Sequence, residues 1–208
     1  MFMKIVIVLL LPLAIVLTVF QFIAFDKNWY EKEFEKLGVY GSLGQEKVLG
    51  EMNNVLDYFH GSAELDANFY TKKEMLHLAD ARELLVRVKW ANITIIIILA
   101  ILGMFIVKKK GLKEFFKNIF LSGFVSLVSF ILIILISALM FDTLFYLFHK
   151  ISFSNDFWLL DPEREFLVVI FPQELFSDIF QRIIFYALMI SVSITIASKI
   201  FLTKKSQT

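Results

Sequence analysis

The sequence predicts an all-α membrane protein with four transmembrane helices, both termini in the cytoplasm, and a small α/β cap outside the membrane. Hydrophobic residues make up 58% of its 208 residues, and only three prolines and eight glycines interrupt the apolar runs. A helix needs roughly 20 apolar residues to cross a bilayer, and four runs reach about this length. Lysines gather in one short connection between these runs, which predicts the orientation.

The four predicted spans divide the chain into seven segments. These are a first helix within 1–25, an outer segment 26–89, a second helix 90–107, a basic loop 108–118, a third helix 119–141, an outer segment 142–182, and a fourth helix with its tail, 183–208. The first span is longer than the roughly 7–15 residues of a signal-peptide core and lacks a small-x-small cleavage pattern. We therefore expect it to remain as an uncleaved helix. The third run stays apolar to Leu147, so its helix should continue beyond the membrane surface.

The basic residues orient these spans. Loop 108–118 holds five lysines against one glutamate, and the tail adds Lys204 and Lys205. Because lysines favour the cytoplasmic side, the loop and both termini should face the cytoplasm. The outer segments are net acidic, with 9 basic and 12 acidic side chains in 26–89, and 3 and 7 in 142–182. We expect a multi-pass protein of the plasma membrane with an extracytoplasmic active face and no nucleic-acid partner.

The first outer segment shows helical patterns. Apolar residues recur on one face over Glu46–Phe59, as in an amphipathic helix. Thr71 and Glu74 match a capping box, which marks a helix start. The helix that begins there should pass through His77 and Asp80 and feed into the second span. These two side chains share a face, so a hydrogen bond from the imidazole N–H of His77 to Asp80 could fix the tautomer of His77.

The second outer segment contains a turn signal between two apolar stretches. Asp161-Pro162 separates 157–160 from 166–171, and the second stretch is rich in valine. This pattern predicts a short β-hairpin. Asn155 and Asp156 are typical turn-capping residues, and Trp158 is typical of an anchor at the membrane interface.

The chain has no cysteine, so thiolate nucleophiles and thiolate metal ligands are excluded. Its three histidines, His60, His77 and His149, all lie outside the predicted spans. Imidazole is the side chain best matched to proton transfer near neutral pH. We therefore regard the histidines as the first candidates for chemistry.

Two sequence elements resemble the lipoprotein intramolecular transacylase family. The first is H-x-x-D-A-R at His77–Arg82, and the second is F-H-x(5)-N-D-x-W-L-L-D-P at Phe148–Pro162, followed by Phe171-Pro172. The resemblance implies a four-span acyltransferase that moves the sn-2 acyl chain of a diacylglyceryl lipoprotein to the α-amino group of its own N-terminal cysteine. The product is a lyso-form lipoprotein. Neither a cofactor nor a metal is implied, and the partners are the lipoprotein substrate and membrane lipids.

The resemblance places the catalytic histidines at His77 and His149, and not at His60. In our hypothesis, His77 deprotonates the attacking amine, and His149 stabilises the oxyanion or protonates the leaving oxygen. The opposite assignment is equally compatible with the sequence. Supporting or orienting roles are expected for a further set of motif residues: Asp80, Asn155, Asp156, Trp158 and Asp161.

Two other classes of function stay open from the sequence. A metal-dependent membrane hydrolase could use His77, Asp80, His149 and Asp156 as ligands, if these groups converge on one ion. Alternatively, a non-enzymatic four-span protein could bind a partner through its acidic outer surface.

Overall fold

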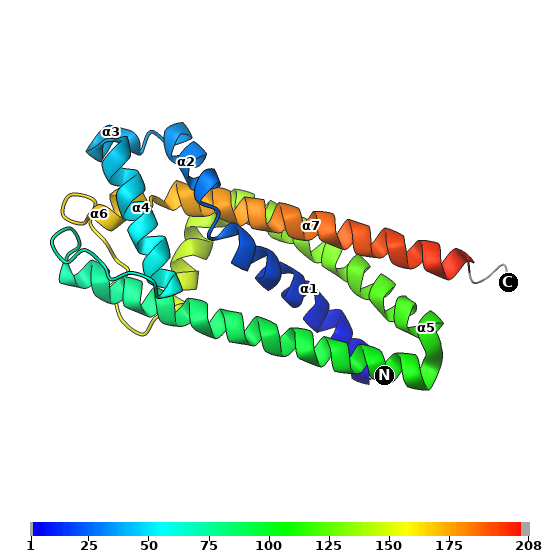
Figure 1. Cartoon of the computed structure of the whole chain (residues 1–208). Helices are drawn as coiled ribbons and strands as arrows, with labels where there is room; N and C mark the ends of the chain where they lie inside the picture. The colour runs from blue at the N-terminus through cyan, green and yellow to red at the C-terminus, as the bar shows by residue number, and fades with distance from the viewer. Residues whose placement is uncertain (1, 205–208) are drawn as a thin grey trace. The chain divides into compact units, whose positions relative to one another are not determined.

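The computed structural model describes residues 2–204, so Lys205 of the predicted cytoplasmic tail lies outside the described part. The chain divides into two compact units. The first, here called the span unit, comprises residues up to Ile23, 88–139 and 181 onward; the second, the cap unit, comprises 24–87 and 140–180. All regular secondary structure in residues 2–204 is helical (Figure 1).

Within residues 2–204, three helices are long and apolar enough to cross a membrane: α1 (Phe2–Ile23), α5 (Lys72–Ser152) and α7 (Gln173–Lys204). Helix α5 has 81 residues, about 120 Å if straight, which far exceeds a bilayer of roughly 30 Å. Gly111 interrupts it with a φ of +81°, a left-handed value that favours glycine. Figure 1 shows the green part of α5 turning back on itself. Helix α5 thus supplies two apolar arms to the span unit, and the basic stretch 108–118 forms the bend between them.

Short polar side chains join the helices of the span unit. The Asn92 amide donates to Thr18 Oγ1 at 3.1 Å, and Ser122 Oγ donates to the carbonyl of Ile7 at 3.0 Å, so α1 is bonded to both arms of α5. A Cβ on Gly123 would lie 2.5 Å from Thr195 Oγ1, so glycine permits a close approach of α5 and α7. Small and hydroxyl-bearing residues are typical of helix contacts in membranes, where backbones pack closely.

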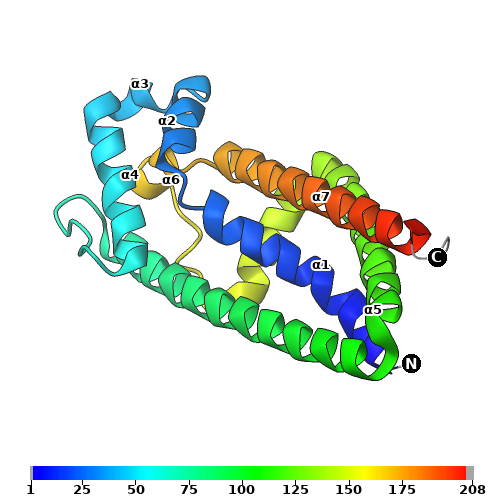
Figure 2. The ribbon, with the colours of Figure 1, turned by 45° about the vertical axis from the view of Figure 1, so that its right-hand side comes forward.

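The cap unit contains α2 (Lys27–Lys36), α3 (Tyr40–Leu43), α4 (Gln45–His60) and α6 (Phe166–Ile170), together with both ends of α5 and the start of α7 (Figure 2). The predicted amphipathic helix 46–59 is confirmed as α4, which ends at Gly61 in the left-handed conformation. Phe34, which is completely buried, packs edge-on against Phe171 at 6.0 Å between ring centroids. This aromatic contact joins α2 to the segment that follows α6.

The predicted capping box is also confirmed, and its acid has a second role. Glu74 is fully buried. One of its carboxylate oxygens accepts from the backbone N–H of Thr71 at 2.7 Å, and the other from the backbone N–H of Leu167 at 2.6 Å. The same side chain therefore starts α5 and fixes the first turn of α6. As predicted, α5 continues without a break from this start into the span unit, and its far end extends beyond Phe141 to Ser152.

The predicted β-hairpin over 157–171 is wrong, and the cap has no strand within the described residues. The backbone N–H groups of Arg164 and Glu165 both donate to the carbonyl of Asp161, which forms a turn. The apolar run that follows buries Leu167 and Ile170, which are spaced as on one face of a helix. The bond from Leu167 to Glu74 satisfies one of the free amides at the start of this helix. Helix α6 forms instead of a strand.

Candidate active site

His77 lies on the second turn of α5, and the capping box one turn earlier sets its position. The adjacent Leu78 is buried, whereas His77 is partly exposed. The Nδ1 atom of His77 is nevertheless buried and has no hydrogen-bond partner in the described part of the chain. Because buried polar atoms are usually bonded, this nitrogen is a site where a bound molecule could supply the missing partner.

His149 lies on the last turn of α5 and is only 7% exposed. Its Nδ1 lies 2.7 Å from the carbonyl oxygen of Phe145. A carbonyl oxygen only accepts hydrogen bonds, so Nδ1 carries the hydrogen and donates it. In the neutral ring, Nε2 is then the unprotonated nitrogen and can accept a proton.

Aromatic rings surround His149. The indole of Trp158 stacks on the imidazole, with 4.9 Å between ring centroids and 29° between planes, and the ring of Phe145 lies at 4.4 Å. Trp158 is 9% exposed, so the predicted interface anchor packs inside the cap unit. Its indole N–H donates to the carbonyl of Asn155 at 3.0 Å.

The structure brings His77 and His149 together, with 5.9 Å between their ring centroids. Phe153 contacts both, at 5.3 Å from His77 and 5.8 Å from His149. The two motifs that carry the family resemblance therefore meet at one place in the cap unit. A polar group between the two rings would be within reach of both imidazoles.

Burial disfavours the charged form of both imidazoles. It lowers the pKa of His77 from 6.5 to about 4, and the neighbouring His149 lowers it further, while Asp80 opposes the shift. Burial also lowers the pKa of His149, but the hydrogen bond to Phe145 raises it in part. The bond to the Phe145 carbonyl thus supports the imidazolium form of His149. Nδ1 of His77 has no such hydrogen bond.

The predicted bond between Asp80 and His77 is not among the contacts of Asp80 in the described residues, and Nδ1 of His77 has no partner. Oδ2 of Asp80 instead accepts from the side-chain amide of Asn155 at 2.8 Å. The Oδ1 of Asn155 in turn accepts from the backbone N–H of Phe157 at 3.1 Å. Asp80 therefore fixes the loop that carries Trp158, whose indole stacks on His149. The charge of Asp80 also raises the pKa of His77.

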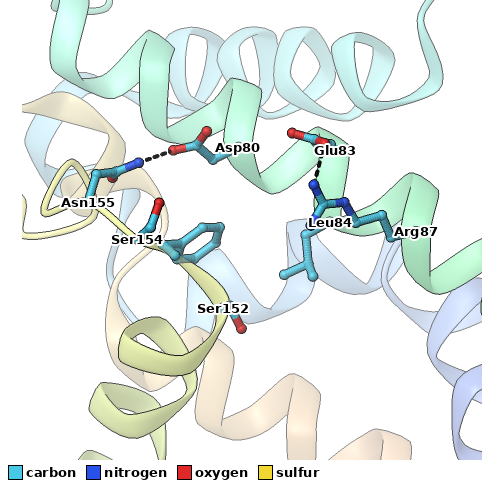
Figure 3. Close-up of a pocket in the computed structure, with 8 residues that line it drawn as sticks. Asp80, Glu83, Leu84, Arg87, Ser152, Ser154 and Asn155 are labelled. Atoms are coloured by element: carbon cyan, nitrogen blue, oxygen red, sulfur yellow. Dashed lines mark hydrogen bonds and ion pairs between the residues drawn. The ribbon is translucent and has the colours of Figure 1, made fainter.

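A polar pocket of about 130 Å³ is lined in part by Phe153, whose ring contacts both histidines (Figure 3). Its lining consists of Asp80, Glu83, Leu84, Arg87, Ser152, Phe153, Ser154 and Asn155. Figure 3 shows the Asp80–Asn155 bond on one side and the ion pair of Glu83 with Arg87 on the other. Since Phe153 also contacts both histidines, the pocket and the pair share this ring as a wall.

Three residues singled out in the sequence have other surroundings. Asp156 is exposed and lies 3.6 Å from the Lys150 amine, and the side chain of Asp161 accepts from the backbone N–H of Glu163. His60 is exposed and its Nδ1 bonds the carbonyl of Leu56. Within residues 2–204, no group of three or more histidine and carboxylate side chains is arranged to hold a metal ion, and the four proposed ligands do not form one.

Sequence reasoning missed the ring contacts around the pair. Phe145 lies one turn before His149 on the same helix face, a spacing that could have indicated the contact. Phe153 lies beyond the end of α5, and nothing in the local sequence indicates that it touches His77. Glu83 and Arg87 also line the pocket, and no motif in the sequence singles them out.

Solved structures of a membrane-integral protein have the same fold. The lipoprotein intramolecular transacylase Lit from Bacillus cereus matches with a TM-score of 0.87 at 21% identity, over 100% of this chain and 97% of that one. A variant of that protein with one histidine changed to alanine gives 0.82 at 21% identity, over 100% and 95%. Another with histidine changed to arginine gives 0.80 at 22%, over 99% and 92%. The fold is that of a multi-pass helical membrane protein.

The family model "Lipoprotein intramolecular transacylase Lit" matches residues 5–176, which is most of the chain. The protein belongs to this family and is an acyltransferase that carries out an intramolecular transfer on lipoproteins. The resemblance indicated by the two motifs is thereby confirmed. No curated protein sequence matches the chain.

The lowered pKa of His77 predicts that the fold loses stability in mild acid. Unfolding restores the pKa to 6.5, so the unfolded chain binds more protons between pH 6.5 and about 4, and stability falls as the pH drops through this window. Between pH 7 and 5 the protein should lose on the order of 1–2 kcal/mol more than the variant His77→Gln. Thermal unfolding in detergent at several pH values measures this difference. Parallel pH profiles for the two proteins would contradict it.

Proposed function

We propose that the histidine pair transfers the sn-2 acyl chain of a diacylglyceryl lipoprotein to the α-amino group of its N-terminal cysteine. The observation that carries this proposal is the meeting of the two family motifs at His77 and His149, whose ring centroids lie 5.9 Å apart. The substrate supplies its own nucleophile, the amine. The protein then needs a proton carrier, an oxyanion donor and a means of positioning the amine against the ester.

His149 is the better proton carrier. Its Nδ1–H is held by the carbonyl of Phe145, which leaves Nε2 as the acceptor and supports the imidazolium once it forms. The amine nitrogen attacks the ester carbon, and Nε2 of His149 takes the proton of that nitrogen. The imidazolium then gives this proton to the departing glyceryl oxygen. The nitrogen–carbon bond forms, the ester bond breaks, and the proton ends on the glyceryl hydroxyl.

His77 suits the second task, stabilising the oxyanion. With a pKa of about 4 it stays neutral at physiological pH, so it is a weak base but still offers an N–H donor. Neutral imidazole with a lowered pKa serves as the electrophile in other enzymes. This assignment is the reverse of our sequence hypothesis. Two observations support this reversed assignment: Nδ1 of His77 is buried without a partner, and the ring of His77 lies beside that of His149.

The polar pocket beside Phe153 is placed to receive the peptide part of the substrate. Peptide groups need hydrogen-bond partners, and the lining offers both carboxylates and the Arg87 guanidinium. The acyl chains would remain in lipid, and we propose that substrate enters sideways from the outer leaflet.

The proposed topology has four spans, both termini in the cytoplasm and the cap outside the plasma membrane. The two arms of α5 on either side of Gly111 supply the second and third spans, and the lysines of 108–118 support the orientation.

Replacing either histidine of the pair should slow transfer by orders of magnitude, while replacing His60 should not. Loss of the proton carrier in His149→Ala should reduce the rate by about 10²–10⁴, and loss of the oxyanion donor in His77→Ala by about 10²–10³. Mass spectrometry of a reporter lipopeptide measures the acyl chain moved to nitrogen at constant acyl count. His60→Ala is the matched control and should stay within about twofold. Unimpaired transfer by His149→Ala would rule out the proposed mechanism.

Asp80 should act as a positioning residue, unlike Asp156. In Asp80→Asn the Asn155 amide loses its carboxylate acceptor and the negative charge near His77 is removed, so the rate should fall about tenfold and the pKa of His77, followed by NMR titration, should move lower. Asp156→Asn is the control, because the exposed side chain of Asp156 pairs with the exposed amine of Lys150, and both its rate and the pKa of His77 should stay nearly unchanged. Equal losses of rate for the two variants, or an unshifted pKa of His77 in Asp80→Asn, would contradict the role of Asp80.

The topology can be tested by labelling, because the chain has no cysteine of its own. A single cysteine at the exposed Ser62 of the cap should react with a membrane-impermeant maleimide on intact cells. A cysteine at the exposed Lys109 should react only after permeabilisation. The reversed pattern would show that the cap faces the cytoplasm.

A further inference from the structure

The span unit has an apolar groove beside the bend of α5, outside both histidine motifs. Its volume is about 460 Å³, within the range of about 300–1,000 Å³ typical of small-ligand sites. The lining consists of Leu99, Ala100, Gly103, Met104, Val107, Lys108 and Phe115. All of these except Lys108 are apolar, so the groove offers hydrocarbon contacts along its length and a charge at one end.

Both arms of α5 build this groove. Phe115 lies after the bend at Gly111, and the other lining residues lie before it. The ring of Phe115 approaches the first arm closely, since a Cβ on Gly103 would lie 3.0 Å from Cε2 of Phe115. The surrounding helix face exposes large apolar side chains, including Ile101 and Phe105. In a multi-pass membrane protein such a face contacts lipid tails, so an acyl chain can fill the groove.

The lysine end of the groove carries uncompensated positive charge. Lys108 is followed by three more exposed lysines around the bend, at 109, 110 and 113. None of these four forms an ion pair within residues 2–204. Glu114 is the sole acidic residue in the described part of the span unit, and it lies 3.5 Å from the amine of Lys117. The charge near Lys108 therefore remains available for an anion.

We propose that this groove binds one anionic phospholipid, with an acyl chain along Leu99 to Val107 and the phosphate at Lys108. Basic pockets between transmembrane helices are general sites for anionic headgroups, and each lysine near such a surface contributes about 1 kcal/mol. The apolar lining adds the burial of the chain, which free phosphate cannot supply. The site is independent of acyl transfer, and its occupant is a membrane lipid that is not consumed.

Native mass spectrometry of the purified full chain tests the site, with phosphatidylglycerol or phosphatidylcholine added at equal concentration. One phosphatidylglycerol should be retained at least about fivefold better than phosphatidylcholine, the factor expected for one lysine. Lys108→Gln should bring the ratio close to one. Lys117→Gln is the matched control, because that lysine is paired with Glu114 and does not line the groove, and should keep the preference.

A second pair of variants tests the groove itself. Ala100→Phe should fill it and prevent retention of both lipids, whereas Ala197→Phe, at an exposed alanine of α7 outside the groove, should not. The proposal is overturned if the parent retains both lipids equally, if Lys117→Gln loses as much preference as Lys108→Gln, or if Ala100→Phe retains phosphatidylglycerol normally. The second result would indicate diffuse charge, and the third a headgroup contact without a chain site.

Discussion

The buried carboxylate of Glu74 is the constraint on which the cap unit depends. A carboxylate with no exposure is costly unless donors surround it, and here two backbone N–H groups, from Thr71 and Leu167, point at its oxygens. The first bond starts α5 and the second starts α6. One turn after Glu74 the same helix presents His77, so the position of the first histidine follows from the satisfaction of this acid.

The other end of α5 depends on a second polar link, which joins the two halves of the site. Asp80 accepts from Asn155, and Asn155 holds the loop whose Trp158 covers His149. Together with Phe153, these contacts cover much of both rings. The resulting desolvation disfavours imidazolium and lowers the pKa of both histidines, while the carbonyl of Phe145 supports the imidazolium of His149 alone. The chemical difference between His77 and His149 thus originates in their different surroundings.

The parts of this structure that the sequence predicts are those set by local interactions. The capping box at Thr71 and the amphipathic face of α4 involve residues three or four apart, and both are confirmed. The prediction of a hairpin failed because the conformation of 166–170 is fixed by Glu74, which is remote in the chain. Valine-rich sequence favours a strand only when a partner strand exists, and here a buried carboxylate offers a helix start instead. The contact of Phe153 with His77 is equally non-local.

The division of charge between the units follows from the same chemistry. All acidic side chains except Glu114 fall in the cap unit, where backbone and side-chain donors can satisfy them. The span unit joins its helices through Ser122, Asn92 and Gly123 instead, which need no counter-charge. An unpaired carboxylate among lipid-facing helices would be expensive, and proton transfer requires titratable groups. The cap unit therefore provides the protein interior in which carboxylates such as Glu74 and the imidazole of His149 are buried.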